Sequence, residues 1–353
     1  MRAGGEAAPP SLVAERLTAQ LLAGPPARDP VAVAEHLLAI QGQDQRGARL
    51  AVRARSEGTC AADVDRALTT DRSLLITWLN RGTLHLVRSE DYPWLQAVTT
   101  PPLFTASARR LGQEGVTPEA AERGVAVIER ALAEEGPLVR AVLRDRVAAA
   151  GVRAAGQALV HILLLASLRG LVVRGPVVGR EQAFVLVRDW LDASALDPVD
   201  RDAALPELAR RYLAGHGPAA ARDLARWAGI SLGDARRGLA GLTSGLEQRD
   251  DGLVDLARRE AAPELPPPRL LGAFDPVLLG WTSREEMVGP DGAGIVTKNG
   301  IFRPFALAGG RAVATWRLAG GEVALEPFGR LTAGDRAALD ADAAAVQRFL
   351  GVE

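Results

Sequence analysis

The sequence repeats one local pattern, in which helical segments are followed by two short β-prone runs around a turn. In its clearest copy, the runs Leu74–Leu79 and Thr83–Val87 flank the turn Asn80-Arg81-Gly82. Apolar and β-branched residues on both sides of such a turn predict a β-hairpin. Several helices followed by a two-stranded hairpin are typical of a winged-helix module, and this pattern restricts the folds open to the chain.

Two later stretches follow the same plan. Gly136-Pro137 and Gly217-Pro218 each open a predicted helix, and each is followed by another helical segment and by two β-prone runs. Similar units at comparable positions indicate an internal repeat. The sequence therefore predicts three tandem winged-helix modules, which cover residues 11–112, 113–196 and 197–262.

The remaining residues, 263–353, differ in character. They begin with the proline-rich boundary Pro263–Pro268, continue with short strands separated by glycine turns, and end with a predicted helix, Gly334–Leu350. Short strands at regular spacing suggest a small sheet or barrel. The expected fold class is α+β, with three winged-helix modules followed by a small β-rich, barrel-like C-terminal domain and a final helix.

Composition narrows the classes of function. The net charge of −1 argues against a protein that coats nucleic acid indiscriminately, although it permits a local basic groove. The single cysteine, Cys60, and four scattered histidines give no disulfide framework and no metal-ligand spacing, so no metal or cofactor is expected. The N-terminus lacks the apolar segment of a signal peptide, the apolar run His161–Leu171 is too short to span a bilayer, and no heptad repeat indicates a dimer. We expect a cytoplasmic monomer that does not bind membranes.

A polar stretch interrupts the apolar pattern of the first module. The apolar helix predicted for Val31–Ile40 runs into Gln41-Gly42-Gln43-Asp44, where amides are costly to bury unless they find hydrogen-bond partners. Arg46, Arg49 and Arg53 follow at intervals of three and four residues, so they share one face of the next helix. A polar cluster beside a basic helical face suggests a site that acts on a polyanion.

Three stretches together carry a resemblance to a known family. They are Ile40–Asp44, Trp78–Val87, and Phe274–Gly280 with the later Ala314–Arg317. In combination, the chain resembles the winged-helix DNA glycosylases of the AlkZ/YcaQ type from about Ser11 to Phe349. The family implies tandem winged helices around a DNA channel. It also implies excision of N7-alkylated purines from double-stranded DNA, including bulky adducts and interstrand cross-links.

The resemblance also implies catalytic residues. The family's Gln-x-Gln motif falls on Gln41 and Gln43, and this form is similar to the branch associated with self-resistance to the cross-linking natural product azinomycin. The glycine at position 42 is smaller than the aliphatic residue expected between them. The implied function is a DNA glycosylase of base excision repair. The alternative is a non-catalytic winged-helix DNA-binding protein, such as a transcription regulator or a lesion sensor.

Glutamines can suffice for this reaction because an N7-alkylguanine already carries a positive charge and leaves as a neutral base. What remains is to hold a water near the anomeric carbon and to stabilise the developing positive charge, which amide oxygens can do. Residues two apart face the same side only where the backbone is extended or turning. On spacing alone, a capping role for Gln41 and Gln43 is favoured, but the resemblance reverses this in favour of catalysis. Asp44, ranked below the glutamines, is either a secondary catalytic base or an N-cap.

Candidate DNA contacts come from one helix and two turns. They are Arg46, Arg49 and Arg53 of the basic face, Asn80 and Arg81 of the first turn, and Lys298 and Asn299 of a later turn that ends at Gly300. The competing interpretation is a solvated helix face and two ordinary tight turns. His85 alternates with leucines on its strand and is expected to be structural. Lys298 is the only lysine, so Schiff-base chemistry and strand cleavage are not expected, and the enzyme should be monofunctional.

Overall fold

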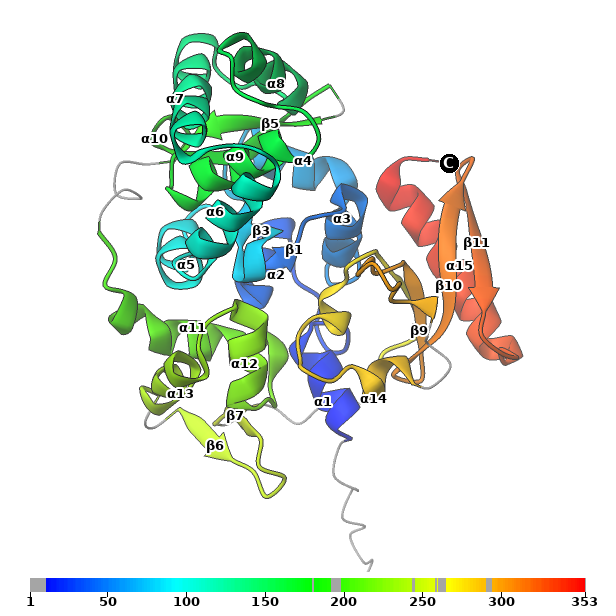
Figure 1. The fold of residues 1–353 in the computed structure, drawn as a ribbon. Coiled ribbons are helices and arrows are strands. Elements are labelled where there is room, and N and C mark those ends of the chain that lie inside the picture. The colour runs from blue at the N-terminus through cyan, green and yellow to red at the C-terminus, as the bar shows by residue number, and fades with distance from the viewer. Residues whose placement is uncertain are drawn as a thin grey trace, which may run out of the picture.

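Short helices and a hairpin make up the first part of the chain. The computed structural model describes residues 11–179, 181–191, 198–242, 245–257, 259, 265–289 and 294–352, and Figure 1 shows how its elements are arranged. The elements of the first part are α1 (Leu12–Ala19), α2 (Pro30–Leu37), β1 (Ile40–Gln41), α3 (Gln45–Arg53), α4 (Ala61–Thr69), β2 (Leu74–Leu79), the 3-10 turn η1 (Asn80–Gly82), β3 (Thr83–Arg88), α5 (Tyr92–Thr99) and α6 (Leu103–Gln113).

Side chains at the helix ends explain several of these boundaries. The hydroxyl of Ser11 and the carboxylate of Asp29 accept backbone N–H groups in the first turns of α1 and α2, at 3.2 and 2.8 Å. Such caps satisfy donors that have no partner within the helix. The C-cap residue of α2, Leu38, has a φ of 66°, which turns the chain out of the helix and into β1. Asp44 caps α3 by accepting the N–H of Gly47.

The next two parts repeat the order of the first, in which a helix, a short extended segment, two helices and a hairpin follow one another. The second part contains α7 (Pro118–Glu135), α8 (Arg140–Ala149), α9 (Ala158–Leu168), β4 (Val172–Val178), β5 (Glu181–Leu186) and the short α10 (Val187–Trp190). The third contains α11 (Arg201–His216), α12 (Ala221–Ala228), α13 (Leu232–Ala240), β6 (Leu246–Gln248) and β7 (Val254–Leu256).

In each part, the short extended segment pairs with the second strand of its hairpin. β1 pairs with β3 in the first part. Leu138 bridges Phe184 in β5, and Ala219 bridges Val254 in β7. Leu138 and Ala219 directly follow the two Gly-Pro pairs. The two stretches that the sequence suggested to be equivalent therefore occupy equivalent places in the structure.

The first two hairpins join into one antiparallel sheet. β2 and β3 pair along their whole length, which confirms the hairpin predicted around Asn80-Arg81-Gly82. β2 also pairs with β4 where Ile76 lies opposite Arg174, which gives the strand order β1-β3-β2-β4-β5. Alternate residues of β2 enter hydrophobic cores on the two faces of the sheet, so all six of them are buried. The sequence predicted both hairpins but did not indicate that they share a sheet.

The C-terminal part is an open sheet with one long helix beside it. Its elements are β8 (Arg269–Leu271), the 3-10 turn η3 (Pro276–Leu278), α14 (Glu285–Val288), β9 (Phe305–Ala308), β10 (Arg311–Ala319), β11 (Glu322–Pro327) and α15 (Ala333–Leu350). Figure 1 shows α15 lying beside β10 and β11. Nowhere in the described ranges does a helix combine the length and the apolar character needed to cross a membrane.

The barrel-like shape expected for this part is wrong. The strands lie in the order β11-β10-β9-β8 and, over the described residues, the outer strands β8 and β11 do not pair with each other. Side chains occupy the outer edge of β8 instead. The carboxylate of Asp342 accepts the N–H of Leu270 at 2.7 Å, and Arg53 donates to the carbonyl of Leu270 at 3.3 Å. Because these backbone groups are satisfied, closure of the sheet would gain little.

Candidate active site

The Gln-x-Gln motif lies on extended backbone at the edge of the five-stranded sheet. Gln41 is the β-sheet partner of His85, and the N–H of Gly42 donates to the carbonyl of Leu84 at 2.7 Å. Both glutamine side chains therefore point to one side, and Nε2 of Gln41 donates to Oε1 of Gln43 at 3.2 Å. The geometry expected for residues two apart is confirmed. A Cβ at position 42 would make only ordinary contacts, the nearest at 3.4 Å. The space around Gly42 therefore does not exclude the Cβ of a larger residue.

The two glutamines line a pocket of about 220 Å³ where the first, third and C-terminal parts meet. Its lining residues are Gln41, Gln43, Arg81, Thr83, Arg226, Phe274, Leu279, Trp281, Arg284, Gly300 and Phe302. Gln41 is 5 % exposed, whereas Gln43 is exposed, so the amide pair runs from the wall of the pocket to solvent. Oε1 of Gln41 is buried and has no hydrogen-bond partner among the described residues. An acceptor of this kind can receive a hydrogen bond from a bound water.

Of the five non-glycine residues with a positive φ in the described ranges, two line this pocket and a third lies three residues before Gln41. Leu38, Arg81 and Phe274 have φ values of 66°, 58° and 57°. These values lie in the left-handed region, which residues other than glycine rarely adopt. Arg81 and Phe274 line the pocket, and Leu38 leads directly into the motif. Each such residue costs about 1–3 kcal/mol, and residues of this kind cluster at functional sites. The surrounding contacts must therefore hold these conformations in place.

Arg81 is held by the end of α12. Its Nη1 donates to the carbonyls of Arg226, at 3.0 Å, and of Trp227. These carbonyls belong to the last turn of α12, where cations are favoured by the helix dipole. A Cβ on Gly229 would lie 2.6 Å from the backbone nitrogen of Arg81, so glycine is required for this approach. The turn that the sequence presents as a wing tip is packed against the third part.

Phe274 is held through its neighbour, Asp275. Asp275 and Arg55 are both fully buried, and their side chains form two hydrogen bonds, of 2.7 and 3.0 Å. Asp275 also accepts the N–H of Val277 at 3.0 Å and so caps η3. The Phe274 ring lies 5.5 Å from the ring of Phe302, centre to centre, on the same side of the pocket. The aromatic wall is thus anchored to the first part by an ion pair.

His85 is structural, in line with the expectation. Burial, reinforced by the charge of Arg81, lowers its pKa to about 3, so the ring is neutral at physiological pH. Nδ1 lies 2.9 Å from the carbonyl of Thr83 and donates to it in this neutral form. His85 therefore supports the strand on which Gln41 is paired.

The arginines of α3 do not form one free basic face. Nε of Arg49 donates to Asp65 of α4 at 2.9 Å, and Arg53 forms an ion pair with Asp342 of α15, where both side chains are less than 15 % exposed. Arg49 and Arg53 are therefore engaged by carboxylates of the helices that pack beside α3, and phosphate contact by these arginines stays a prediction. Arg46 alone of the three is exposed.

The remaining candidates divide into buried and exposed residues. Asn80 is fully buried, and neither side-chain polar atom has a partner within the described parts of the chain, so its side chain is not exposed to DNA in this structure. The turn packs against α12 of the third part, which leaves Arg81 and Gly82 half-buried. Asp44 is an N-cap and does not line the pocket. Lys298 and Asn299 are exposed, on the loop whose Gly300 lines the pocket.

Several pocket residues carried no recognisable signal in the sequence. Arg226 and Arg284 are two of many arginines, and no spacing connects them with the glutamine motif.

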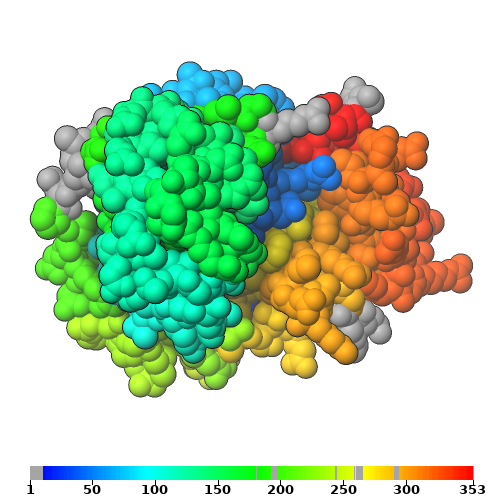
Figure 2. Space-filling model, turned by 45° about the horizontal axis from the view of Figure 1, so that its top comes forward, coloured from blue at the N-terminus to red at the C-terminus, as the bar shows by residue number. Residues whose placement is uncertain are grey.

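A cluster of three or more residues suited to hold a metal ion does not occur in the ranges that the structure describes. Figure 2 shows the second part facing the C-terminal part across a hollow, with N-terminal residues at its bottom.

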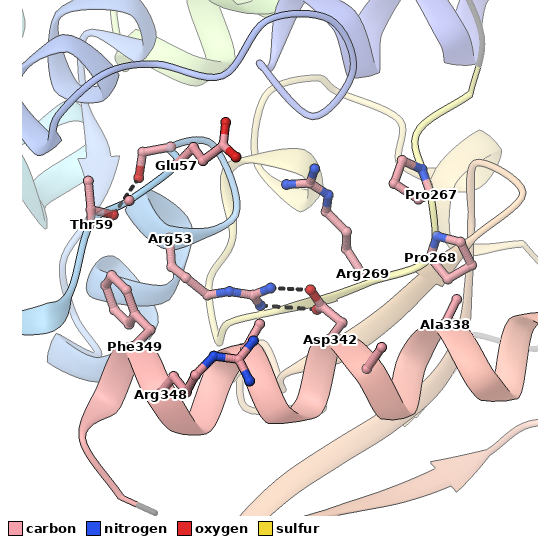
Figure 3. Close-up of a pocket in the computed structure, with 14 residues that line it drawn as sticks. Arg53, Glu57, Thr59, Pro267, Pro268, Arg269, Ala338, Asp342, Arg348 and Phe349 are labelled. Carbon is pink, nitrogen blue, oxygen red and sulfur yellow. Dashed lines mark hydrogen bonds and ion pairs between the residues drawn. The ribbon is translucent and has the colours of Figure 1, made fainter.

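A larger cavity lies elsewhere and does not contain the motif. It has a volume of about 680 Å³ and lies between the loop after α3, the segment before β8, and α15. Figure 3 shows that the paired side chains of Arg53 and Asp342 point into it. This ion pair also closes the edge of β8, so the cavity lies over a structural link between two parts of the chain.

Comparison with known proteins identifies the class of enzyme. The family model described as "DNA glycosylase AlkZ-like" matches residues 34–349. The chain therefore belongs to the AlkZ-like DNA glycosylase family, and the resemblance inferred from the sequence is confirmed.

Two relatives extend this finding. The chain is 28 % identical over 342 residues to an interstrand DNA cross-link repair glycosylase of Streptomyces sahachiroi. The aligned region covers 91 % of this chain and 90 % of that protein. The structure matches that of the DNA glycosylase AlkZ from Streptomyces sahachiroi with a TM-score of 0.80 and 27 % identity, over 96 % of each chain.

Proposed function

We propose that the protein hydrolyses the N-glycosidic bond of N7-alkylated purines in double-stranded DNA, with Gln41 and Gln43 as its catalytic residues. One observation carries this proposal: the two amides meet in a pocket, and the buried carbonyl oxygen of Gln41 has no partner among the described residues. Membership of a DNA glycosylase family supports it. The repeated helix-and-hairpin parts are proposed to be winged helices that hold DNA, divided near residues 112, 196 and 262.

The chemistry follows from the charge of the substrate. A water bound to Oε1 of Gln41 attacks the anomeric carbon while the bond from that carbon to the purine breaks. The bonding electrons neutralise the alkylated base, and the proton lost from the water passes to solvent. The hydrogen bond from Gln41 to Gln43 fixes both amide dipoles before the reaction, so they stabilise the developing cation without reorganisation.

The pocket is open on the side of Gln43 and Gly300, both of which are exposed. An open site suits adducts that cannot swing fully out of the duplex, because a cross-linked base remains tied to the opposite strand. A relative named for interstrand cross-link repair supports the same idea. We therefore include the unhooking of cross-links in the proposal, with self-resistance to an azinomycin-type product as its role.

The test is base release from duplex DNA that contains N7-methylguanine. Gln41→Ala and Gln43→Ala should bind this DNA like the wild type but release the base about 100-fold more slowly or worse. Gln113→Ala, which removes an exposed amide at the end of α6, is the matched control and should be fully active. If the wild type binds DNA but releases no base, the alternative of a non-catalytic DNA-binding protein replaces this proposal.

A further inference from the structure

The pocket around the glutamines has an uncompensated positive charge. Three of its eleven lining residues are arginines, and none is an aspartate or a glutamate. The arginines are Arg81, Arg226 and Arg284, which come from η1, the last turn of α12 and the residue before α14. By contrast, the fully buried Arg55 is neutralised by the carboxylate of Asp275.

Neither Arg226 nor Arg284 meets a carboxylate in the described ranges. Arg226 is exposed, and its guanidinium makes no ion pair or hydrogen bond with described residues. Nε of Arg284 donates to the carbonyl of Leu278 at 3.2 Å, and its guanidinium carbon lies 5.2 Å from the centre of the Phe302 ring. These two contacts orient the Arg284 side chain and leave its terminal nitrogens available.

The charge of Arg226 acts on the other two arginines. Burial lowers the pKa of Arg81 to about 10, and the charge of Arg226 adds to the effect. Burial followed by the charge of Arg226 also lowers the pKa of Arg284. A group of guanidiniums held together without an acid is completed by an anion, and their planar donors match phosphate oxygens.

The positive charge of the pocket argues against the arginines as direct catalysts of the proposed reaction. An N7-alkylated base is itself a cation, and the transition state places further positive charge on the sugar, so three nearby guanidiniums would oppose both. The backbone phosphates beside the damaged nucleotide are the nearest anions that the substrate brings.

We propose that Arg226 and Arg284, with Arg81 behind them, bind a backbone phosphate next to the damaged nucleotide and thereby place its anomeric carbon against Gln41 and Gln43. This inference rests on the proposed function. The two arginines are positioning residues, and the bound phosphate neutralises the charge that would otherwise raise the barrier. DNA binding and the orientation of the sugar are then coupled in one contact.

The first experiment measures binding to a duplex with a tetrahydrofuran abasic analogue, by fluorescence anisotropy at several salt concentrations. Arg226→Gln and Arg284→Gln should each make the slope of log K against log salt less steep. The two changes together should amount to about 0.9, the value for one lost phosphate contact. Arg330→Gln, at an exposed arginine between β11 and α15, outside the pocket and outside the repeated parts, is the charge-matched control and should leave the slope unchanged. Unchanged slopes in both pocket variants would overturn the proposal.

The second experiment removes the partner charge from the DNA. Each phosphate beside the N7-methylguanine is replaced in turn by a neutral methylphosphonate, and single-turnover base release is measured. One replacement should slow the wild type strongly and slow Arg226→Gln and Arg284→Gln much less, because their contact is already lost. Equal slowing of wild type and variants at every position would refute the contact.

These outcomes separate the inference from the proposed function. The salt slopes can be measured even if no base is released, so they judge the phosphate contact when catalysis fails. Conversely, Gln41→Ala could lose activity while the arginine variants keep the wild-type salt slope. This result would refute phosphate binding by Arg226 and Arg284 and leave the catalytic assignment of the glutamines in place.

Discussion

The buried pair of Arg55 and Asp275 should dominate the stability of the pocket wall. Arg55 donates five hydrogen bonds: two to Asp275, two to Gln20 and one to the carbonyl of Ala51, at 2.7–3.1 Å. Both members of the pair are completely buried. The substitution Arg55→Met removes all five donors and leaves the Asp275 carboxylate buried without its cation.

The cost follows from this uncompensated charge. Breaking a buried ion pair by removing one partner destabilises a protein by about 3–5 kcal/mol. The entropy of unfolding, at roughly 2.1 cal/mol/K per residue, is about 0.7 kcal/mol/K for 353 residues unfolding together. The melting midpoint of Arg55→Met should therefore fall by about 4–7 °C.

The assay is thermal unfolding followed by circular dichroism, with a double variant and a control. In Arg55→Met/Asp275→Asn the unpaired charge is gone, so the double variant should be more stable than Arg55→Met alone. Arg146→Met breaks an exposed pair with Glu135, and its midpoint should not change measurably. If Arg55→Met and Arg146→Met melted at the same temperature, the argument from burial would be wrong.

Three further predictions test other parts of the reasoning. Because the pKa of His85 is about 3 instead of 6.5, the unfolded chain binds a proton below pH 6.5 that the folded chain does not. The contribution of neutral His85 to the free energy of unfolding is therefore complete above pH 6.5 and is lost as the pH falls towards 3. In urea titrations between pH 6 and 4, His85→Gln should weaken the pH dependence by about 1.4 kcal/mol per unit. Borohydride should trap no enzyme–DNA adduct. Lys298→Met should retain the wild-type rate of base release in single turnover at saturating enzyme, where a lost DNA contact does not limit the rate; a trapped adduct that disappears in this variant would contradict a monofunctional mechanism. Arg53→Gln should lower the free energy of unfolding by about 1.5–3 kcal/mol and leave the salt slope of DNA binding unchanged. Arg46→Gln should leave the free energy of unfolding unchanged and make the salt slope less steep.

Local pattern was enough to predict the parts that depend on neighbouring residues. The hairpin around Asn80-Arg81-Gly82 and the facing of Gln41 and Gln43 both depend on residues close in sequence. Backbone alternation and turn chemistry decide such features.

The failures concern contacts between distant segments. Asn80 looked like an exposed turn residue, but the turn is packed against α12, which lies about 140 residues later. Arg53 looked like a phosphate contact, but its partner, Asp342, is 289 residues away. The same ion pair occupies the edge of β8 in the open C-terminal sheet, which the spacing of short strands cannot reveal. Arg226 and Arg284 are recognisable only once the third and C-terminal parts meet the motif.

The threefold recurrence of the short extended segment has a practical consequence. In the first part Gln41 pairs with His85 through flanking backbone hydrogen bonds, such as the one from the N–H of Gly42 to the carbonyl of Leu84, whereas the other two segments bridge their hairpins at the apolar residues Leu138 and Ala219. The pairing of all three segments rests on backbone groups and not on the amide of Gln41, so Gln41→Leu should keep its strand yet lack the amide. Such a variant would be suited to capture the protein on intact damaged DNA, so that the lesion can be seen in place before its bond is broken.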